Sequence, residues 1–248
     1  MKAIIFDSST IINLAMNNLL WTLQPLKERY GGDFYITQSI KREIIDTPFH
    51  IKRFKLESIQ IQNMLTKGIF KVYTEQDLTK ETKELGEIAN NIFFNKTNLK
   101  IIDEGELSAL VLAKKINAEA LAIDERTTRL LMESPTTLSN IFKSRFKANI
   151  RTEQKNLKEF KTRVGEVPII RSVEMGMIAY ELGILDEYLP KKDPQTKKDL
   201  LDAILWSMRF KGCAVSEKEM QEILKQEMRI ISSPARDKKQ TQTIRTKK

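Results

Sequence analysis

Two short apolar runs in this chain each end in an aspartate. Residues 3–6 (Ala-Ile-Ile-Phe) run into Asp7, and residues 121–123 (Leu-Ala-Ile) run into Asp124. Brief, uninterrupted apolar runs are typical of strands that are buried on both faces of a parallel sheet. Because ligands bind outside the carboxyl ends of such strands, both carboxylates are expected at the functional edge of one sheet.

The segments between these runs alternate between strand and helix patterns. Short apolar runs predict further strands at residues 34–36 and 69–73, and helical spacing of apolar positions fills the intervals. The helices are expected after Asp7 and over residues 37–44, 54–65, 78–93, 103–113 and 125–132. This alternation predicts an α/β fold with three α/β/α layers, in which helices cover both faces of a mostly parallel sheet.

The charge pattern of the sequence changes after residue 134. Residues 141–163 are strongly basic and show a helical pattern, and residues 232–248 carry six Lys or Arg, one acid and almost nothing apolar. We expect one domain over residues 1–231, a helical basic insertion near residues 134–166 and a disordered basic tail at 232–248. The remaining elements are a strand at 167–170 and helices at 173–182, 199–210 and 216–228.

The composition limits which kinds of functional site this chain can form. Of 248 residues, 41% are hydrophobic, and the single cysteine, Cys213, excludes an intramolecular disulfide. With His50 as the only histidine, a zinc cluster and a serine or cysteine triad are both poorly supported. The net charge of +9 favours anionic partners, nucleic acid first and membrane surfaces second. No apolar run reaches the ~18 residues of a spanning helix, so we expect a cytoplasmic protein without membrane association.

Acidic residues stand at four predicted element ends. They are Asp7, Glu43, the cluster at residues 103–106, and Asp124 with Glu125. Each by itself is explained as a helix cap, a solvated helix acid or a favourable charge at a helix amino end. Taken together they would repel one another at one sheet edge, and a hard divalent cation is the simplest compensation.

The order of these acids resembles the PIN-domain family of metal-dependent nucleases. Asp7-Ser8-Ser9 is similar to the family's opening Asp-x-Ser, and Glu43 matches its early helical glutamate. Residues 105–110 resemble the Gly-Glu-x-x-Ala motif of one prokaryotic branch, and residues 123–129 resemble its Asp-acid-x-x-x-Arg segment. With similarity at residues 171–185 and 211–224, the resemblance covers most of residues 1–231.

The resemblance implies roles for particular residues. The catalytic, metal-binding acids would be Asp7, Glu43, Glu106 and Asp124. Asp103 and Glu104 are alternative ligands, and Asp103, three positions before Glu106, shares its helix face more easily. Ser9 would support the site with its hydroxyl. Arg129 would orient an acid or contact phosphate, and it is equally well explained as a surface cation.

A phosphodiesterase of this kind needs a bound Mg²⁺ or Mn²⁺, which activates water and stabilises the leaving oxygen, and it needs no histidine. The expected substrate is RNA, and the resemblance favours single-stranded RNA. The basic insertion supplies candidate phosphate contacts, with Phe142, Phe146 and Phe160 expected to pack between the cations. These RNA-binding candidates are Lys143, Arg145, Lys147, Arg151 and Lys155.

The leading interpretation is therefore a metal-dependent endoribonuclease, in RNA processing or as a toxin with an antitoxin-like partner, and a homodimer is compatible with either. A haloacid-dehalogenase-like phosphatase would also begin with a strand ending in aspartate. That class needs a second aspartate two residues later, where this chain has Ser9. A non-catalytic RNA-binding module on the same scaffold is the third alternative, and the presence of all four acids argues against it.

Overall fold

The computed structural model describes residues 1–74, 77–191 and 193–232. Its central sheet has five strands in the order β3-β2-β1-β6-β8, and every pairing in it is parallel. The strands are β1 (Ala3–Phe6), β2 (Asp33–Thr37), β3 (Phe70–Tyr73), β6 (Ala120–Ala122) and β8 (Ile169–Ile170). The predicted α/β fold with a mostly parallel sheet is confirmed.

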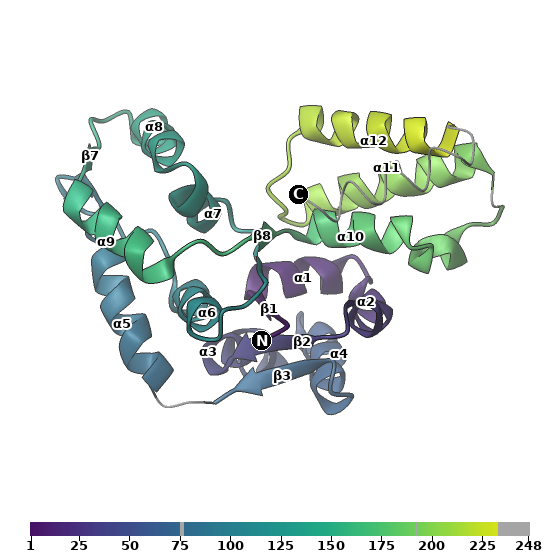
Figure 1. Ribbon diagram of the computed structural model, residues 1–248, viewed down its shortest axis with the longest axis horizontal. Helices are drawn as coiled ribbons and strands as arrows, with labels where there is room; N and C mark the ends of the chain where they lie inside the picture. Colours follow the sequence, from purple (N-terminus) through teal and green to yellow (C-terminus); the bar gives the residue numbers. More distant parts are fainter. Residues whose placement is uncertain (75–76, 192, 233–248) are drawn as a thin grey trace.

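Helices cover both faces of this sheet (Figure 1). On one face α6 (Glu104–Lys115) packs against β1, β2 and β6, and it is covered in turn by α5 (Asp77–Ala89) and α9 (Gln154–Val164). On the other face α1 (Ser8–Met16) contacts α4 (Lys55–Thr66) and α10 (Ser172–Glu181). In the sheet, β2 and β3 lie on one side of β1, and β6 and β8 lie on the other. Because crossovers between parallel strands are right-handed, the connecting helices on the two sides of β1 cover opposite faces of the sheet.

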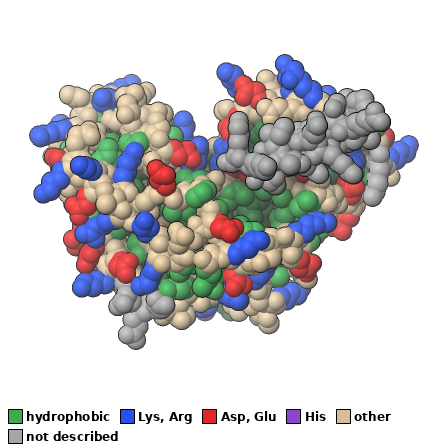
Figure 2. All heavy atoms as spheres, in the orientation of Figure 1, with side chains coloured by type: hydrophobic (Ala, Val, Ile, Leu, Met, Phe, Trp, Pro, Cys, Tyr) green, Lys and Arg blue, Asp and Glu red, His purple; other side chains and the backbone are tan. Residues whose placement is uncertain are grey.

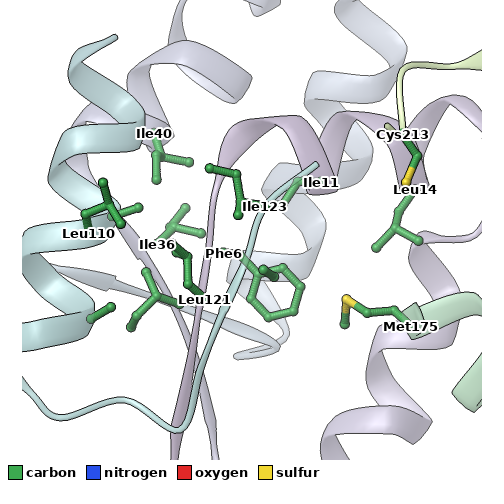
Figure 3. Close-up of a cluster of buried hydrophobic side chains, with 14 of the residues drawn as sticks. Phe6, Ile11, Leu14, Ile36, Ile40, Leu110, Leu121, Ile123, Met175 and Cys213 are labelled. Atoms are coloured by element: carbon green, nitrogen blue, oxygen red, sulfur yellow. The ribbon is translucent and has the colours of Figure 1, made fainter. Parts of the chain in front are cut away.

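The core lies on both sides of the sheet. Phe6 of β1 is fully buried, and its ring lies 4.9 Å from that of Phe34 and 5.1 Å from that of Phe70. Figure 3 shows side chains of the strands and of several helices, including Leu110 and Met175, gathered around the same strands. Burying both faces explains why β1 and β6 read as continuous apolar runs.

Two groups of helices diverge beyond the carboxyl ends of the strands (Figure 1). The chain leaves β6 toward α7 (Arg126–Glu133) and α8 (Pro135–Phe146), and it leaves β8 toward α10. The 3₁₀ helix η4 (Ile184–Tyr188), α11 (Pro194–Phe210) and α12 (Glu217–Ser232) follow α10, and the surface is indented between the two groups (Figure 2). The remaining helices are η1 (Leu20–Thr22), α2 (Leu23–Tyr30), α3 (Gln38–Lys41), the π-helix η2 (Arg42–Asp46) and η3 (Pro48–His50).

The helix predicted over residues 78–93 is too long at its end. Helix α5 stops at Ala89, and Phe93 opens β4 (Phe93–Asn95), which pairs antiparallel with β5 (Thr97–Asn98) and β7 (Arg151–Thr152). The cause is the Asn90-Asn91 pair. Asn90 Oδ1 accepts from the Ile101 N–H at 2.9 Å, and Asn91 Nδ2 donates to a helix carbonyl at 2.6 Å, which offers the backbone an alternative to the helix.

The helical segment predicted over residues 141–163 is helical at both ends but interrupted in the middle. Helix α8 ends at Phe146, Lys147 takes a left-handed conformation with φ of 47°, and β7 intervenes before α9. The Glu153 N–H donates to the carbonyl of Ile92 at 2.7 Å, so pairing with a distant segment outweighs the local helical pattern. The predicted tail lies, from residue 233, outside the described residues. No helix in the described part of the chain is long and apolar enough to span a bilayer.

Candidate metal centre

Asp7 follows β1 directly and caps α1. Its Oδ2 accepts from the Ser9 N–H at 3.0 Å and from Ser9 Oγ at 2.6 Å. The side chain is buried, and within the described residues its Oδ1 has no hydrogen-bond partner. Burial raises the pKa of Asp7 to about 6, and the charge of Glu43 adds to the shift. Buried carboxylate oxygens normally accept a hydrogen bond, so a buried oxygen without a donor is a candidate position for a bound ligand.

Ser9 joins the two strand-end aspartates. Strands β1 and β6 are neighbours, and the Asp7 N–H donates to the Ala122 carbonyl at 2.8 Å. The Ser9 hydroxyl donates to Asp7 and accepts from the Asp124 N–H at 3.0 Å. Ser9 therefore fixes the Asp7 carboxylate against the backbone of the second aspartate.

Glu43 approaches Asp7 from the π-helix η2. Its Oε1 accepts from Ser8 Oγ at 3.0 Å. Its Oε2 lies so close to α6 that a Cβ added at Gly105 would be 2.8 Å away. Partial burial raises the pKa of Glu43, with a contribution from Asp103. The glycine of the Gly-Glu motif is thus the residue that admits this carboxylate to the site.

Glu106 lies in the first turn of α6. Its Oε2 accepts from the Asp103 N–H at 2.9 Å in a capping box. Burial raises the pKa of Glu106 to about 8, and the charges of Asp7 and Glu125 contribute. Asp7, Glu43 and Glu106 therefore form one electrostatically coupled group beyond the end of β1.

The two alternative ligands face other partners. Asp103 pairs with Lys100 at 2.8 Å, and Glu104 pairs with Arg42 at 3.1 Å. Both acids are exposed at the start of α6. Each of the two therefore has a surface cation as its partner, whereas no ion-pair partner of Asp7, Glu43 or Glu106 is found among the described residues.

Asp124 is buried at the end of β6 and turns toward α10. Its Oδ1 accepts from the Ser172 N–H at 2.6 Å, and its Oδ2 accepts from Ser172 Oγ at 2.6 Å. Burial raises the pKa of Asp124, and Glu174 is the acid that adds to this shift. Asp124 thus shares Ser9 with Asp7, but its carboxylate is held by the C-terminal helices.

The donor set fits a hard divalent cation such as Mg²⁺ or Mn²⁺. It consists of carboxylate oxygens without histidine or cysteine, it includes the unpartnered Oδ1 of Asp7, and a glycine leaves space beside Glu43. Across the described ranges, however, no three His, Cys, Asp or Glu side chains are arranged to hold a metal ion. Asp7 interacts electrostatically with Glu43 and with Glu106, and the convergence of the four acids on one metal ion stays a prediction.

Arg129 lies on α7 against the C-terminal segment. Its Nη1 contacts Glu133 at 3.2 Å, and its Nη2 donates to the Ala214 carbonyl at 3.5 Å. These contacts connect α7 to the loop before α12.

The basic insertion is an exposed surface on α8, β7 and α9. Lys143, Arg145, Lys147, Arg151 and Lys155 are all exposed, and none of the five has an ion-pair partner among the described residues. Figure 2 shows Lys and Arg side chains spread over this part of the molecule. Phe142 and Phe160 are buried packing residues, whereas Phe146 is exposed beside Arg145. These cations are accessible for contacts with phosphates.

Two residues of this site were not expected from the sequence: Ser8 orients Glu43, and Ser172 holds Asp124. Glu125, which was expected at an element end beside Asp124, adds charge near Glu106. Ser8 stands inside the Asp7-Ser8-Ser9 motif, so its position was a usable signal. No local pattern marks Ser172, which lies 48 residues from its partner.

A family model described as a PIN domain matches residues 3–134, slightly more than half of the chain. This chain belongs to the PIN-domain family, whose members are generally nucleases. The matched segment contains Asp7, Glu43, Glu106 and Asp124, and it ends before most of the basic insertion and before Ser172. Comparison with curated proteins found no match, and comparison with solved structures found none either.

Proposed function

We propose that this protein is a divalent-cation-dependent endoribonuclease. The observation that carries the proposal is the coupling of the buried Asp7, with its unpartnered Oδ1, to Glu43 and Glu106. Three acids whose pKa values are all raised at one sheet edge are costly in the absence of a counter-charge. In a PIN-domain chain this cost is the expected signature of a metal centre.

The residues of the site have distinct tasks in this proposal. Asp7 would bind the cation through Oδ1 while Ser9 holds Oδ2, and Ser8 would orient Glu43. Glu106 and Asp124 would complete the ligand set directly or through water. When bound, Mg²⁺ or Mn²⁺ supplies an activated water and relieves charge on the leaving oxygen.

Single-stranded RNA is the proposed substrate, in the cytoplasm. The support is the basic surface on α8, β7 and α9, where Lys143, Arg145, Lys147, Arg151 and Lys155 are exposed and have no ion-pair partner among the described residues. Such cations gain affinity by releasing counterions from phosphates. RNA processing and growth control by a toxin with an antitoxin-like partner are both compatible with this activity.

The test is cleavage of a labelled single-stranded RNA by Asp7→Asn. The amide preserves the shape but removes the anion, so we expect a loss of at least ~100-fold, beyond the ~10–100-fold typical of outer-shell changes. EDTA should abolish the wild-type activity and added Mn²⁺ should restore it. Asp199→Asn removes an equivalent charge from the exposed face of α11 and should leave cleavage unchanged.

Three outcomes would overturn the proposal. Metal-dependent cleavage by Asp7→Asn at the wild-type rate would place the chemistry elsewhere. RNA binding without cleavage by the wild-type protein, under all divalent ions tried, would indicate a non-catalytic RNA-binding module. A covalent aspartyl-phosphate at Asp7 would instead favour the phosphatase, although Ser9 occupies the position of that class's second aspartate and already bonds Asp7.

A further inference from the structure

Helix α10 reaches the candidate metal centre through its first residue, Ser172. Ser172 is fully buried, and both of its hydrogen-bond donors point at Asp124. The backbone N–H binds one carboxylate oxygen and the hydroxyl binds the other, each at 2.6 Å. Two donors on two different oxygens fix the rotation of a carboxylate as well as its position.

This contact leaves Asp124 able to bind something else. Each carboxylate oxygen has two acceptor positions; Ser172 uses one on each, and the Cys213 thiol also hydrogen-bonds the carboxylate, which leaves at least one position for a ligand. A residue that satisfies one acceptor position of a metal-binding acid while leaving the other free is the usual form of an outer-shell partner, which orients the ligand.

The start of α10 is itself held rigidly. Arg171, which is buried, forms ion pairs with Glu174 of its own helix and Glu219 of α12, and its Nη1 donates to the Ala214 carbonyl at 3.0 Å. The Arg171 N–H also donates to Glu174 at 2.7 Å. Helices α10 and α12 are therefore clamped together directly behind Ser172.

Cys213 lies beside the contact between Asp124 and Ser172. It is buried next to Asp124 and Ser172, and burial raises the pKa of its thiol to about 12, so it remains neutral there. The surroundings of Asp124 on this side thus come from residues 171–219, beyond the segment matched by the family model.

We propose that Ser172 is a positioning residue for the metal centre, which sets the orientation of the Asp124 carboxylate from the C-terminal helices. The inference rests on the proposed function, since it assigns Asp124 to the ligand set. It makes α10 to α12 part of the functional unit and not an appendage to the PIN domain.

The experiment measures Mn²⁺ binding by the full-length protein with isothermal titration calorimetry. Ser172→Ala removes the hydroxyl and should weaken Mn²⁺ binding about 10-fold or more, within the range seen for outer-shell partners. Ser172→Thr restores the hydroxyl and should bind within about threefold of wild type. Ser207→Ala removes a comparable hydroxyl from α11, one whose only partner among the described residues is the Ile204 carbonyl, and should bind like wild type.

Cleavage assays separate positioning from a general loss of stability. Ser172→Ala should raise the Mn²⁺ concentration needed for half-maximal cleavage, with a much smaller change in the rate at saturating Mn²⁺. A merely structural defect would lower the rate at every Mn²⁺ concentration. If the alanine variant does not fold, Ser172→Cys preserves the volume with a weaker donor and should show the same shift to a smaller degree.

The outcomes distinguish the two proposals. Wild-type Mn²⁺ affinity in Ser172→Ala, or in Asp124→Asn, together with lost affinity in Asp7→Asn, would overturn the role of Ser172 and leave the nuclease intact. Unchanged Mn²⁺ binding and cleavage in Asp7→Asn would overturn the proposed function and this inference with it.

Discussion

Gly105 and Glu43 lie so close together that a side chain at position 105 would displace the Glu43 carboxylate. A Cβ there would lie 2.8 Å from Glu43 Oε2, while its other near neighbours, Ile40 Cγ1 and Glu43 Cδ, would lie at 3.7 and 4.0 Å. The atom that would have to move is the end of a flexible side chain. The close approach therefore constrains the carboxylate and leaves the fold unaffected.

We predict that Gly105→Ala lowers cleavage about 10-fold or more without lowering stability. The methyl group displaces the Glu43 carboxylate, whereas alanine is favoured over glycine in a helix by up to ~1 kcal/mol. Cleavage rates and thermal unfolding measured on the same samples check both parts. Gly86→Ala, in α5, places a methyl against Leu107 instead and serves as the control. Wild-type cleavage by Gly105→Ala would show that the position of Glu43 is unimportant.

We predict that Ser9→Ala reduces both stability and cleavage. The substitution removes a donor from Asp7 and leaves the Asp124 N–H without its acceptor. An unsatisfied buried donor costs roughly 1–3 kcal/mol. Urea unfolding should show that loss, and cleavage at a fixed Mn²⁺ concentration should fall more than tenfold (~10–100-fold) as the Asp7 carboxylate becomes mobile. A destabilised variant with full activity would contradict the bridging role of Ser9.

We predict that the metal-free protein loses stability as pH rises from about 5 to about 8. The pKa of Glu106 is raised from 4.5 to about 8. Within that window the folded state keeps a proton that the unfolded state releases, so the free energy of unfolding falls by up to roughly 1.4 kcal/mol per pH unit for this group. Urea unfolding in EDTA at several pH values measures the slope.

Glu106→Gln provides the test of that assignment. The amide cannot titrate, so the pH dependence should become shallower and the variant should gain stability over wild type as pH rises. Glu104→Gln, an exposed residue of the same helix turn, is the matched control and should keep the wild-type slope. Equal slopes in wild type and Glu106→Gln would mean that this carboxyl does not titrate in the window.

We predict that the basic insertion contributes RNA affinity and not chemistry. Replacing Lys143, Arg145 and Lys147 together by alanine should weaken binding and reduce the log-log salt slope by up to roughly 2, because each phosphate contact on a single strand contributes about 0.7. Fluorescence anisotropy in the Asp7→Asn background avoids cleavage during the measurement. Cleavage by the same triple variant at saturating RNA should be close to wild type.

The control removes three other exposed cations, which lie on α11, directly after α11 and on α12. Replacing Lys198, Lys211 and Lys225 by alanine changes the net charge equally. If both triple variants lose the same affinity, general charge and not this surface attracts RNA. If neither does, the path of the RNA lies elsewhere.

Part of the candidate site could be expected from local sequence patterns. Asp7 and Asp124 could be placed at one sheet edge because each ends an apolar run, and β1 and β6 are indeed adjacent. Short, continuous apolar runs of this kind are typical of parallel strands that are buried on both faces. The capping box of α6 likewise has a sequence signature, since Asp103 and Glu106 stand three positions apart.

Other features depended on contacts between distant segments. The basic helix predicted over residues 141–163 is interrupted because β7 pairs with β4, and the turn of Asp124 toward Ser172 joins residues 48 positions apart. By itself the sequence determined which segments form strands and helices and which acids lie at their ends, because these depend on periodicity and local hydrogen bonding. Only the tertiary structure decided where each carboxylate points, because that depends on donors supplied by elements that are remote along the chain.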